Sequence, residues 1–110
     1  MGVKGVVWVG ASRKEIRGMP EMARQRLGRA LRVVQEGGTP PDWKWMRSVG
    51  DGVIEIRVEA AGAFRLMYVA RLLNAVYVLH VFEKKSRKTP KLNITVARAR
   101  LASVRRQSQE

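Results

Sequence analysis

The chain has 110 residues, with 22 Lys and Arg against nine Asp and Glu, and a formal net charge of +13 at pH 7. It contains no cysteine, which excludes disulfide bonds and thiolate metal sites. No apolar run is long enough to span a bilayer, so we expect no membrane partner and a cytoplasmic location. The length predicts one domain, residues 1–110. The positive surface predicts an anionic partner, either nucleic acid or an acidic protein.

The first half of the chain predicts one strand and two helices. Val6–Val9 is a short apolar run between turn signals, as is typical of a strand. Ser12, with Glu15 three residues later, fits a capping box and predicts the start of a short helix. A second helix is expected from Pro20, because apolar residues then recur at helical spacing until Gly37-Gly38.

From Trp43 the period changes to two, which predicts four short strands joined as an antiparallel meander. The expected strands are about Lys44–Val49, Val53–Glu59, Ala63–Ala70 and Ala75–Phe82. The expected turns are Asp51-Gly52, Ala61-Gly62 and, with a weaker signal, Leu73-Asn74. A final helix is expected from Pro90, where apolar residues return to helical spacing.

Alternation along these strands sorts their side chains onto two faces. Arg57 and Arg65 alternate with apolar residues, so both should face away from the apolar side of the sheet. In the last strand the same rule places His80 and Phe82 on the face of Val78. If the helices cover one side of the sheet, its other side stays open to the two arginines.

A cluster of four cations follows the last strand and precedes a helix-start signal, Thr89-Pro90. The four cations are Lys84, Lys85, Arg87 and Lys88. Such a cluster between two rigid elements favours phosphate binding, to which a helix N-terminus contributes. The alternative is a solvated run of charges.

Arg57 and Arg65 are candidates for bidentate contact with phosphate. The alternative is that they form salt bridges with Glu55, Glu59 or Glu83. We favour phosphate contact, and we expect Arg65 to be the most important residue of the site.

Several strings at their separations resemble the RelE/ParE toxin superfamily, in particular its HigB-like, phage-derived branch. The strings are Asp51–Arg57, Phe64–Tyr68, Val78–Lys85 and Ser86–Pro90, followed by Ala97 and Arg100. The resemblance covers about Met46–Leu101. It implies an α+β, RelE-like fold of order β-α-α-β-β-β-β-α, with a small antiparallel sheet, two N-terminal helices packed on one side, and a C-terminal helix.

The resemblance also implies a function. It implies the toxin of a type II toxin–antitoxin pair, an endoribonuclease that cleaves mRNA in the ribosomal A site without a metal or other cofactor. Its partners would be mRNA, the ribosome and a cognate helix-turn-helix antitoxin. Arg65, Lys84 and Lys85 occupy positions where such enzymes keep functional cations, and Arg57 lies where basic catalytic residues occur. Two alternatives stay open: a ParE-like inhibitor of DNA gyrase, and a non-catalytic RNA-binding domain.

Metal-free RNA cleavage has the 2′-hydroxyl attack the adjacent phosphate, giving a 2′,3′-cyclic phosphate. It needs a base, cations that stabilise the developing charge, and an acid for the leaving oxygen. Lys84 or Lys85 can act as base only if neighbouring cations lower its pKa. His80 is the single conventional acid or base near neutrality, although a lone histidine near the end of an apolar strand is more often structural.

The remaining candidates are aromatic. Tyr68 fits core packing and stacking on a base equally well. Trp43 and Trp45 share a face by strand spacing, and such rings stack on unpaired bases. Packing or an antitoxin contact is the favoured alternative for the tryptophans. Trp45 and Tyr68 join Arg87 and Lys88 as predicted RNA-binding residues, and no cluster of carboxylates favours a metal site.

Overall fold

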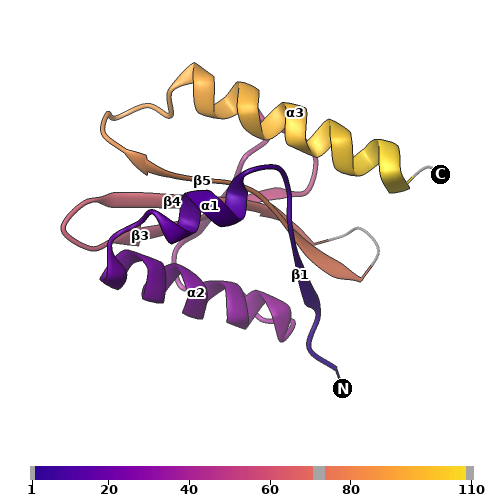
Figure 1. Cartoon of the computed structure of the whole chain (residues 1–110), viewed down its shortest axis with the longest axis horizontal. Coiled ribbons are helices and arrows are strands. Elements are labelled where there is room, and N and C mark those ends of the chain that lie inside the picture. The colour runs from indigo at the N-terminus through magenta and orange to yellow at the C-terminus, as the bar shows by residue number, and fades with distance from the viewer. Residues whose placement is uncertain (1, 71–73, 109–110) are drawn as a thin grey trace.

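The computed structural model describes residues 2–70 and 74–108, and in these residues five strands form one sheet with helices on both faces (Figure 1). The elements are β1 Gly5–Trp8, α1 Ser12–Arg17, α2 Glu21–Gln35, β2 Trp43–Trp45, β3 Val53–Glu59, β4 Ala63–Val69, β5 Ala75–Lys84 and α3 Lys91–Ser108. The predicted α+β class and element order are confirmed. None of the helices in the described part is long and apolar enough to cross a membrane.

The sheet has the strand order β1-β5-β4-β3-β2 and is mixed. Strands β2 to β5 form the predicted antiparallel meander. β1 pairs in parallel with the first half of β5, from Gly5 opposite Ala75 to Trp8 opposite Val78. The prediction of an antiparallel sheet is wrong for this pair, because periodicity locates a strand without specifying its partner.

The boundaries of the strands follow local hydrogen bonding. β3 has the predicted bounds, whereas β2 ends early because the chain turns after Met46, whose carbonyl accepts bonds from the N–H groups of Val49 and Gly50. β5 continues two residues past Phe82. At the β4–β5 turn Leu73 lies outside the described residues, and Asn74 has the positive φ of +58° that turn asparagines tolerate.

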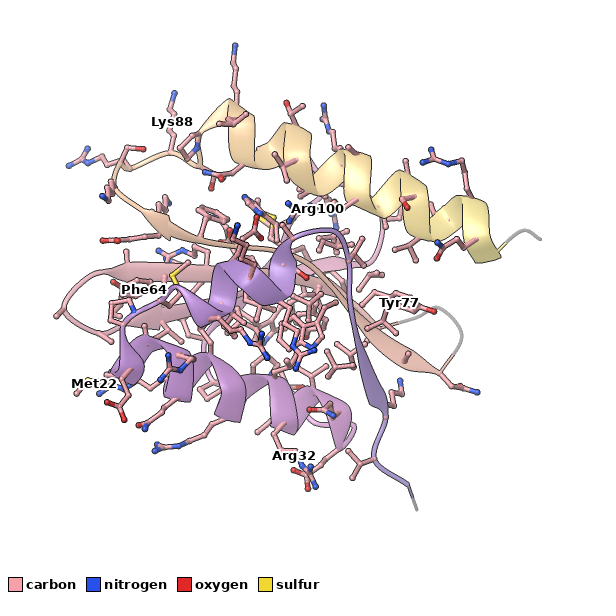
Figure 2. All side chains as sticks on the ribbon, viewed as in Figure 1. Met22, Arg32, Phe64, Tyr77, Lys88 and Arg100 are labelled. Atoms are coloured by element: carbon pink, nitrogen blue, oxygen red, sulfur yellow. The ribbon has the colours of Figure 1, made fainter. Side chains whose placement is uncertain are left out.

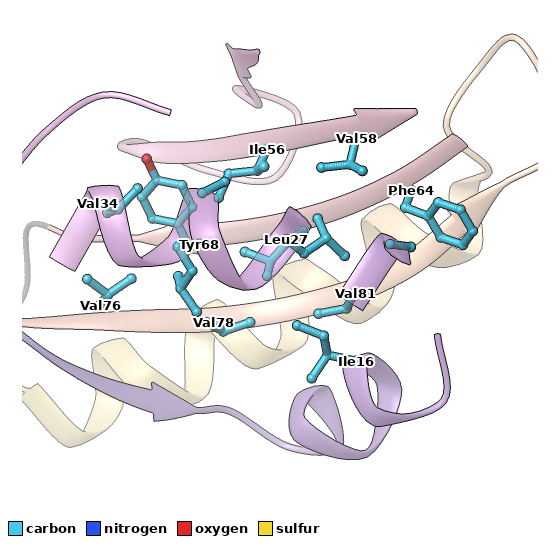
Figure 3. Packing of buried hydrophobic residues seen from close by; sticks show 14 of the residues in the cluster. Ile16, Leu27, Val34, Ile56, Val58, Phe64, Tyr68, Val76, Val78 and Val81 are labelled. Atoms are coloured by element: carbon cyan, nitrogen blue, oxygen red, sulfur yellow. The ribbon is translucent and has the colours of Figure 1, made fainter. Parts of the chain in front are cut away.

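The helices α1 and α2 cover one face of the sheet and form the α2-side core (Figure 3). The buried residues of α2 recur at the predicted helical spacing; they are Ala23, Leu27, Ala30, Leu31 and Val34. They pack against apolar residues of β3, β4 and β5, among them Ile56, Leu66 and Val78. Each fully buried aliphatic side chain contributes about 1.5–3 kcal/mol by leaving water.

The helix α3 covers part of the opposite face and forms the α3-side core. Its buried residues Ala97, Leu101 and Val104 pack against apolar side chains of the sheet. The close approach depends on Gly50, because a Cβ atom at this position would collide with Leu101. The opposite face is therefore open only where α3 does not reach, which corrects the prediction that all of it is open.

A β-bulge in β5 changes which side chains share a face. Met67 is opposite His80 but Tyr68 is opposite Val78, so Leu79 is an extra residue. Val78 consequently packs in the α2-side core and Phe82 in the α3-side core. The predicted common face for the two was wrong, because a continuously apolar strand gives no sign of a bulge.

Candidate functional site

Charged side chains from four strands meet on the part of the sheet that α3 leaves open. We name this set the charged cluster; it consists of Lys44, Glu55, Arg57, Arg65 and Lys84. The strand register assembles it, since Lys44 is opposite Glu55 and Arg57 is opposite Arg65. Like charges directly opposite each other in a sheet are unfavourable, so the two arginines require carboxylates nearby.

Glu55 and Arg65 form the buried floor of the charged cluster. Their side chains are 0% and 4% exposed, and Arg65 Nε lies 3.7 Å from Glu55 Oε1. Arg65 Nη1 also donates to Glu59 Oε1 at 3.2 Å and to the Phe64 carbonyl at 3.0 Å. The structure thus places Arg65 in the salt bridges that the sequence left as the alternative, while its contact with phosphate stays a prediction.

Glu55 is a site residue that the sequence analysis named only as a possible salt-bridge partner of the two arginines. Burial raises the pKa of Glu55, although the positive charges of Lys44 and Arg65 act to lower it. Within the described part of the chain neither carboxylate oxygen has a hydrogen-bond partner. The sequence did contain a signal for this position. Glu55 alternates with Ile56 in the same way as Arg57, so the alternation along the strand places Glu55 and Arg57 on the same face.

Lys84 is a half-buried cation of the charged cluster. Burial lowers the pKa of Lys84, and the positive charges of Arg65, Lys44 and Arg57 lower it further, against the opposing effect of Glu55. Neighbouring cations therefore lower the pKa of a lysine, as predicted. These cations belong to the sheet, whereas the prediction placed them in the cationic run after β5. A lowered pKa increases the fraction of neutral amine, the form that accepts a proton.

A groove of about 560 Å³ begins at the charged cluster and extends to the start of α3. Five cations line it: Lys44, Arg47, Lys84, Arg87 and Lys88. Figure 2 shows Lys88 on the connection that leads to α3. The structure thus brings Lys84, Arg87 and Lys88 together as predicted, and adds two cations from the β2 segment that the sequence analysis missed.

Lys85 and Trp45 differ in their relation to this groove. Lys85 follows the last residue of β5, is exposed, and is not among the residues that line the groove. The structure therefore does not bring Lys85 together with the other predicted catalytic cations around this groove. Trp45 is 44% exposed and lines the groove, with its ring centroid 5.4 Å from that of Trp43 in an edge-to-face contact.

Tyr68 belongs to the core. It is 2% exposed and lies among the side chains of the α2-side core, on the face of the sheet opposite Arg65 (Figure 3). Burial raises the pKa of Tyr68 to about 12, so its hydroxyl stays protonated. The predicted stacking of Tyr68 on a base is wrong, and the core alternative is confirmed.

A second polar cluster closes the open edge of β5 beyond the end of β1. The Val81 N–H donates to Glu15 Oε1 at 3.1 Å, and Arg100 Nη1 donates to the Leu79 carbonyl at 2.9 Å. Arg100 also binds both oxygens of Glu15, at 2.8 and 3.0 Å. Figure 2 shows Arg100 on the inner side of α3. Side chains from α1 and α3 therefore satisfy backbone groups that a neighbouring strand would otherwise bond.

His80 is part of this second cluster. Its Nδ1 lies 3.0 Å from Glu15 Oε1 and its Nε2 lies 2.7 Å from Asn93 Oδ1. The ring is 6% exposed and stacks on Phe82 with centroids 5.0 Å apart. The structural alternative for His80 is the one observed, and its predicted role as catalytic acid or base is corrected, because both nitrogens are engaged away from the charged cluster.

The predicted capping box is also wrong. The N-cap of α1 is Ala11, without a side-chain hydrogen bond, and Ser12 is already helical. Glu15 points to β5 instead. Burial alone would raise the pKa of Glu15, but hydrogen bonds from His80, Arg100 and the Val81 N–H outweigh burial and lower the pKa from 4.5 to about 2.

Glu15 should make stability depend on pH in the acid range. Because its folded pKa is below its unfolded value, its contribution is fully present above about pH 4.5 and is lost as the pH falls toward 2. We expect Glu15→Gln to lower the free energy of unfolding by about 2–3 kcal/mol at pH 7. The difference from wild type should shrink between pH 4.5 and pH 2, as measured by urea denaturation. A difference that is constant over this range would contradict the assignment.

The fold is that of a small RelE-like α+β domain. Its mixed sheet has the N-terminal helices on one face and the C-terminal helix on the other, and cations lie at the end of its last strand. Residues 14–102 match the phage-derived protein Gp49-like family, and the chain belongs to this family. It is a family of RelE/HigB-like toxins, which confirms the resemblance at this level. No protein in the curated set matches the sequence. Among the described residues, no group of three or more His, Cys, Asp or Glu is placed to hold a metal ion.

Proposed function

We propose that this protein is a HigB-like toxin of a type II toxin–antitoxin pair that cleaves mRNA on the ribosome without a metal ion. One observation carries the proposal: half-buried Lys84, whose pKa is lowered, lies between the cations of the sheet at the head of a cationic groove. Membership in a toxin family supports it. A cytoplasmic location follows from mRNA as the substrate.

The charged cluster has the groups that this chemistry needs. Arg57, whose side chain is 37% exposed, and Lys44 would bind the scissile phosphate and stabilise the charge that develops on it. The neutral amine of Lys84 would take the proton of the 2′-hydroxyl as its oxygen attacks phosphorus. The bond to the 5′-oxygen then breaks, and that oxygen leaves as a hydroxyl with a proton from a cationic amine. The products are a 2′,3′-cyclic phosphate and a 5′-hydroxyl end.

Glu55 and Arg65 would act as positioning residues in this mechanism. Their burial keeps them from direct contact with the substrate in this conformation. Glu55 attracts the guanidinium of Arg65, which Glu59 and the Phe64 carbonyl hold by hydrogen bonds. The positive charge of Arg65 contributes to the lowered pKa of Lys84. The two residues of the pair thus act on the pKa of Lys84 in opposite directions, and the effect of Arg65 is the larger one.

The groove would bind the phosphates that flank the cleaved linkage. We expect Arg87→Ala together with Lys88→Ala to weaken binding of single-stranded RNA and to reduce the slope of log K against log salt by about 1.4, since each lost phosphate contact removes about 0.7. Fluorescence anisotropy at several salt concentrations measures both quantities. The matched control is Arg24→Ala with Arg32→Ala, which removes the same charge from α2 (Figure 2). Equal slopes for the two double variants would argue against the groove.

The activity itself is tested by mapping RNA ends. Purified protein is added to mRNA with and without programmed ribosomes, and 5′-hydroxyl ends are sequenced. We expect new ends, at a fixed position relative to the reading frame, only when ribosomes and wild-type protein are both present. Intact mRNA together with loss of gyrase supercoiling would instead establish the ParE-like alternative. Salt-sensitive RNA binding with no cleavage would establish a non-catalytic binding domain.

The family points to an antitoxin as a partner, and we propose that it carries a helix-turn-helix domain. The positive surface supports an acidic contact region on that partner, since 22 basic residues face nine acidic ones.

A further inference from the structure

A second cavity, of about 390 Å³, lies between α2 and the end of β3. We name it the α2–β3 pocket. Its apolar lining consists of Ala30, Val33, Pro41, Ile56 and Val58. Its charged lining consists of Arg26, Arg29, Arg57, Asp42 and Glu59. The size is in the lower part of the range of about 300–1,000 Å³ that is typical of ligand pockets.

The pocket exists because β2 is short. β2 pairs with β3 only between Ile54 and Ile56, and one further bond joins the Arg57 N–H to the Asp42 carbonyl at 2.9 Å. In the described residues no strand lies beside Val58 on this side of β3. The apolar surface between α2 and β3 is thus left without a cover from the sheet itself.

The end of β3 is protected against the addition of another strand. Arg26 Nη1 donates to the Glu59 carbonyl at 2.7 Å and so occupies the backbone acceptor that a new strand would bond. A partner that uses this surface therefore has to bind through its side chains. An amphipathic helix, which satisfies its own backbone hydrogen bonds, meets this requirement.

The charges around the pocket favour an acidic partner. Three arginines outnumber the two carboxylates of the lining. Arg57 Nε is 4.0 Å from Asp42 Oδ1, which is too long for a hydrogen bond, so this ion pair is weak. A partner's carboxylate that binds Arg57 bidentately would be a stronger contact.

We propose that the α2–β3 pocket docks an acidic amphipathic helix of the antitoxin. The apolar side chains of this helix would pack against Val33 and Val58, and its carboxylates would bind Arg29 and Arg57. The identity of this partner rests on the proposed function, whereas the chemistry of the helix rests on the pocket. Arg57 belongs to the charged cluster as well as to the pocket. Docking would therefore hold the guanidinium of Arg57 away from substrate phosphate, which gives the partner a means of inhibition that does not require it to enter the groove.

Binding is tested with a synthetic helix, without reference to nuclease activity. The probe is a peptide of about 18 residues, since shorter isolated helices are marginal in water. It has leucines at positions i, i+3, i+4 and i+7 and glutamates on the other faces. NMR amide shifts of the full-length protein locate the site, and calorimetry gives Kd. We expect the largest shifts at Ala30, Val33 and Val58, and no binding of a peptide with lysine in place of glutamate.

Matched variants separate the pocket from general charge attraction. Arg29 lines the pocket, so Arg29→Glu reverses a charge of the lining. Arg24→Glu makes the same change of charge elsewhere on α2. We expect Arg29→Glu to raise Kd by about tenfold or more, and Arg24→Glu by less than about threefold. Equal effects, equal binding of a scrambled peptide of the same composition, or shifts confined to the groove would overturn the proposal. Stronger shifts of the pocket amides by single-stranded RNA than by the peptide would also overturn it. If RNA cleavage fails but the peptide binds as expected, only the proposed function is lost.

Discussion

Replacing Lys84 by methionine is expected to lower the rate of RNA cleavage by about 10²–10⁴-fold, the range for loss of a general base. The reason is the position of Lys84 among Arg65, Lys44 and Arg57, which together with burial lowers its pKa. Single-turnover cleavage of ribosome-bound mRNA measures the effect. Lys85→Met is the matched control, since it removes the same charge one residue further on, outside the groove. We expect it to change the rate less than about threefold, as is usual for an exposed charge.

The variant Lys84→Arg distinguishes the two roles that a lysine can have here. Arginine keeps the positive charge but stays protonated at neutral pH, so it cannot accept the proton of the 2′-hydroxyl. If Lys84 is the base, Lys84→Arg should be as inactive as Lys84→Met. In wild type the rate should rise with pH, and the midpoint of this rise should lie below the ordinary pKa of lysine, 10.5. Substantial activity of Lys84→Arg would assign Lys84 to charge stabilisation and leave the base elsewhere.

Arg65→Met is expected to lower the free energy of unfolding by about 3–5 kcal/mol. This change leaves the 0% exposed carboxyl of Glu55 without the cation that lies 3.7 Å from it. Because small domains are stable by only about 5–15 kcal/mol, the loss is a large fraction of the total. Chemical denaturation at pH 7, followed by circular dichroism, measures it.

The double variant Glu55→Leu with Arg65→Met tests whether the pair itself causes this loss. Removing both charges should recover most of the stability, since a buried ion pair often stabilises no more than apolar residues of similar size. Stability that is not recovered, or a loss below about 1 kcal/mol in Arg65→Met alone, would contradict the assignment of a buried pair. The stable double variant also separates chemistry from folding. Its cleavage should still be reduced, because Arg65 lowers the pKa of Lys84 by more than Glu55 raises it, so removal of both charges raises that pKa.

The parts of the fold that local pattern determines could be predicted from the sequence. Val53–Glu59 alternates without interruption, so its bounds and faces follow directly from the spacing. Apart from His80, β5 is apolar from Ala75 to Phe82, and such a run is equally compatible with a regular or a bulged strand. The parallel partner of β1 was not predictable either, because it depends on packing between segments about seventy residues apart.

The features of the site also divide into those that local spacing predicts and those that depend on distant parts of the chain. The phase of the strands placed Arg57 and Arg65 on one face, and the end of β5 placed Lys84 beside them. The positions of Lys44 and Arg47 depend on how a short edge strand and its turn lie against the connection to α3. His80 was predicted with both roles open, and its structural role was fixed by Glu15, which lies far away in the sequence. Local spacing thus predicts orientation, and it does not predict which distant side chain arrives as a partner.

The position of β1 has a consequence for the order of events during synthesis. β1 is synthesised about seventy residues before the strand that it pairs with, β5. A nascent chain therefore cannot complete its sheet until residue 84 is available, and contacts of such long sequence separation form slowly. The cluster that includes Lys84 is assembled at the same late stage. Under the proposed mechanism, RNA cleavage would therefore require that β5 has been synthesised, and a nascent chain that stops before residue 84 would be inactive.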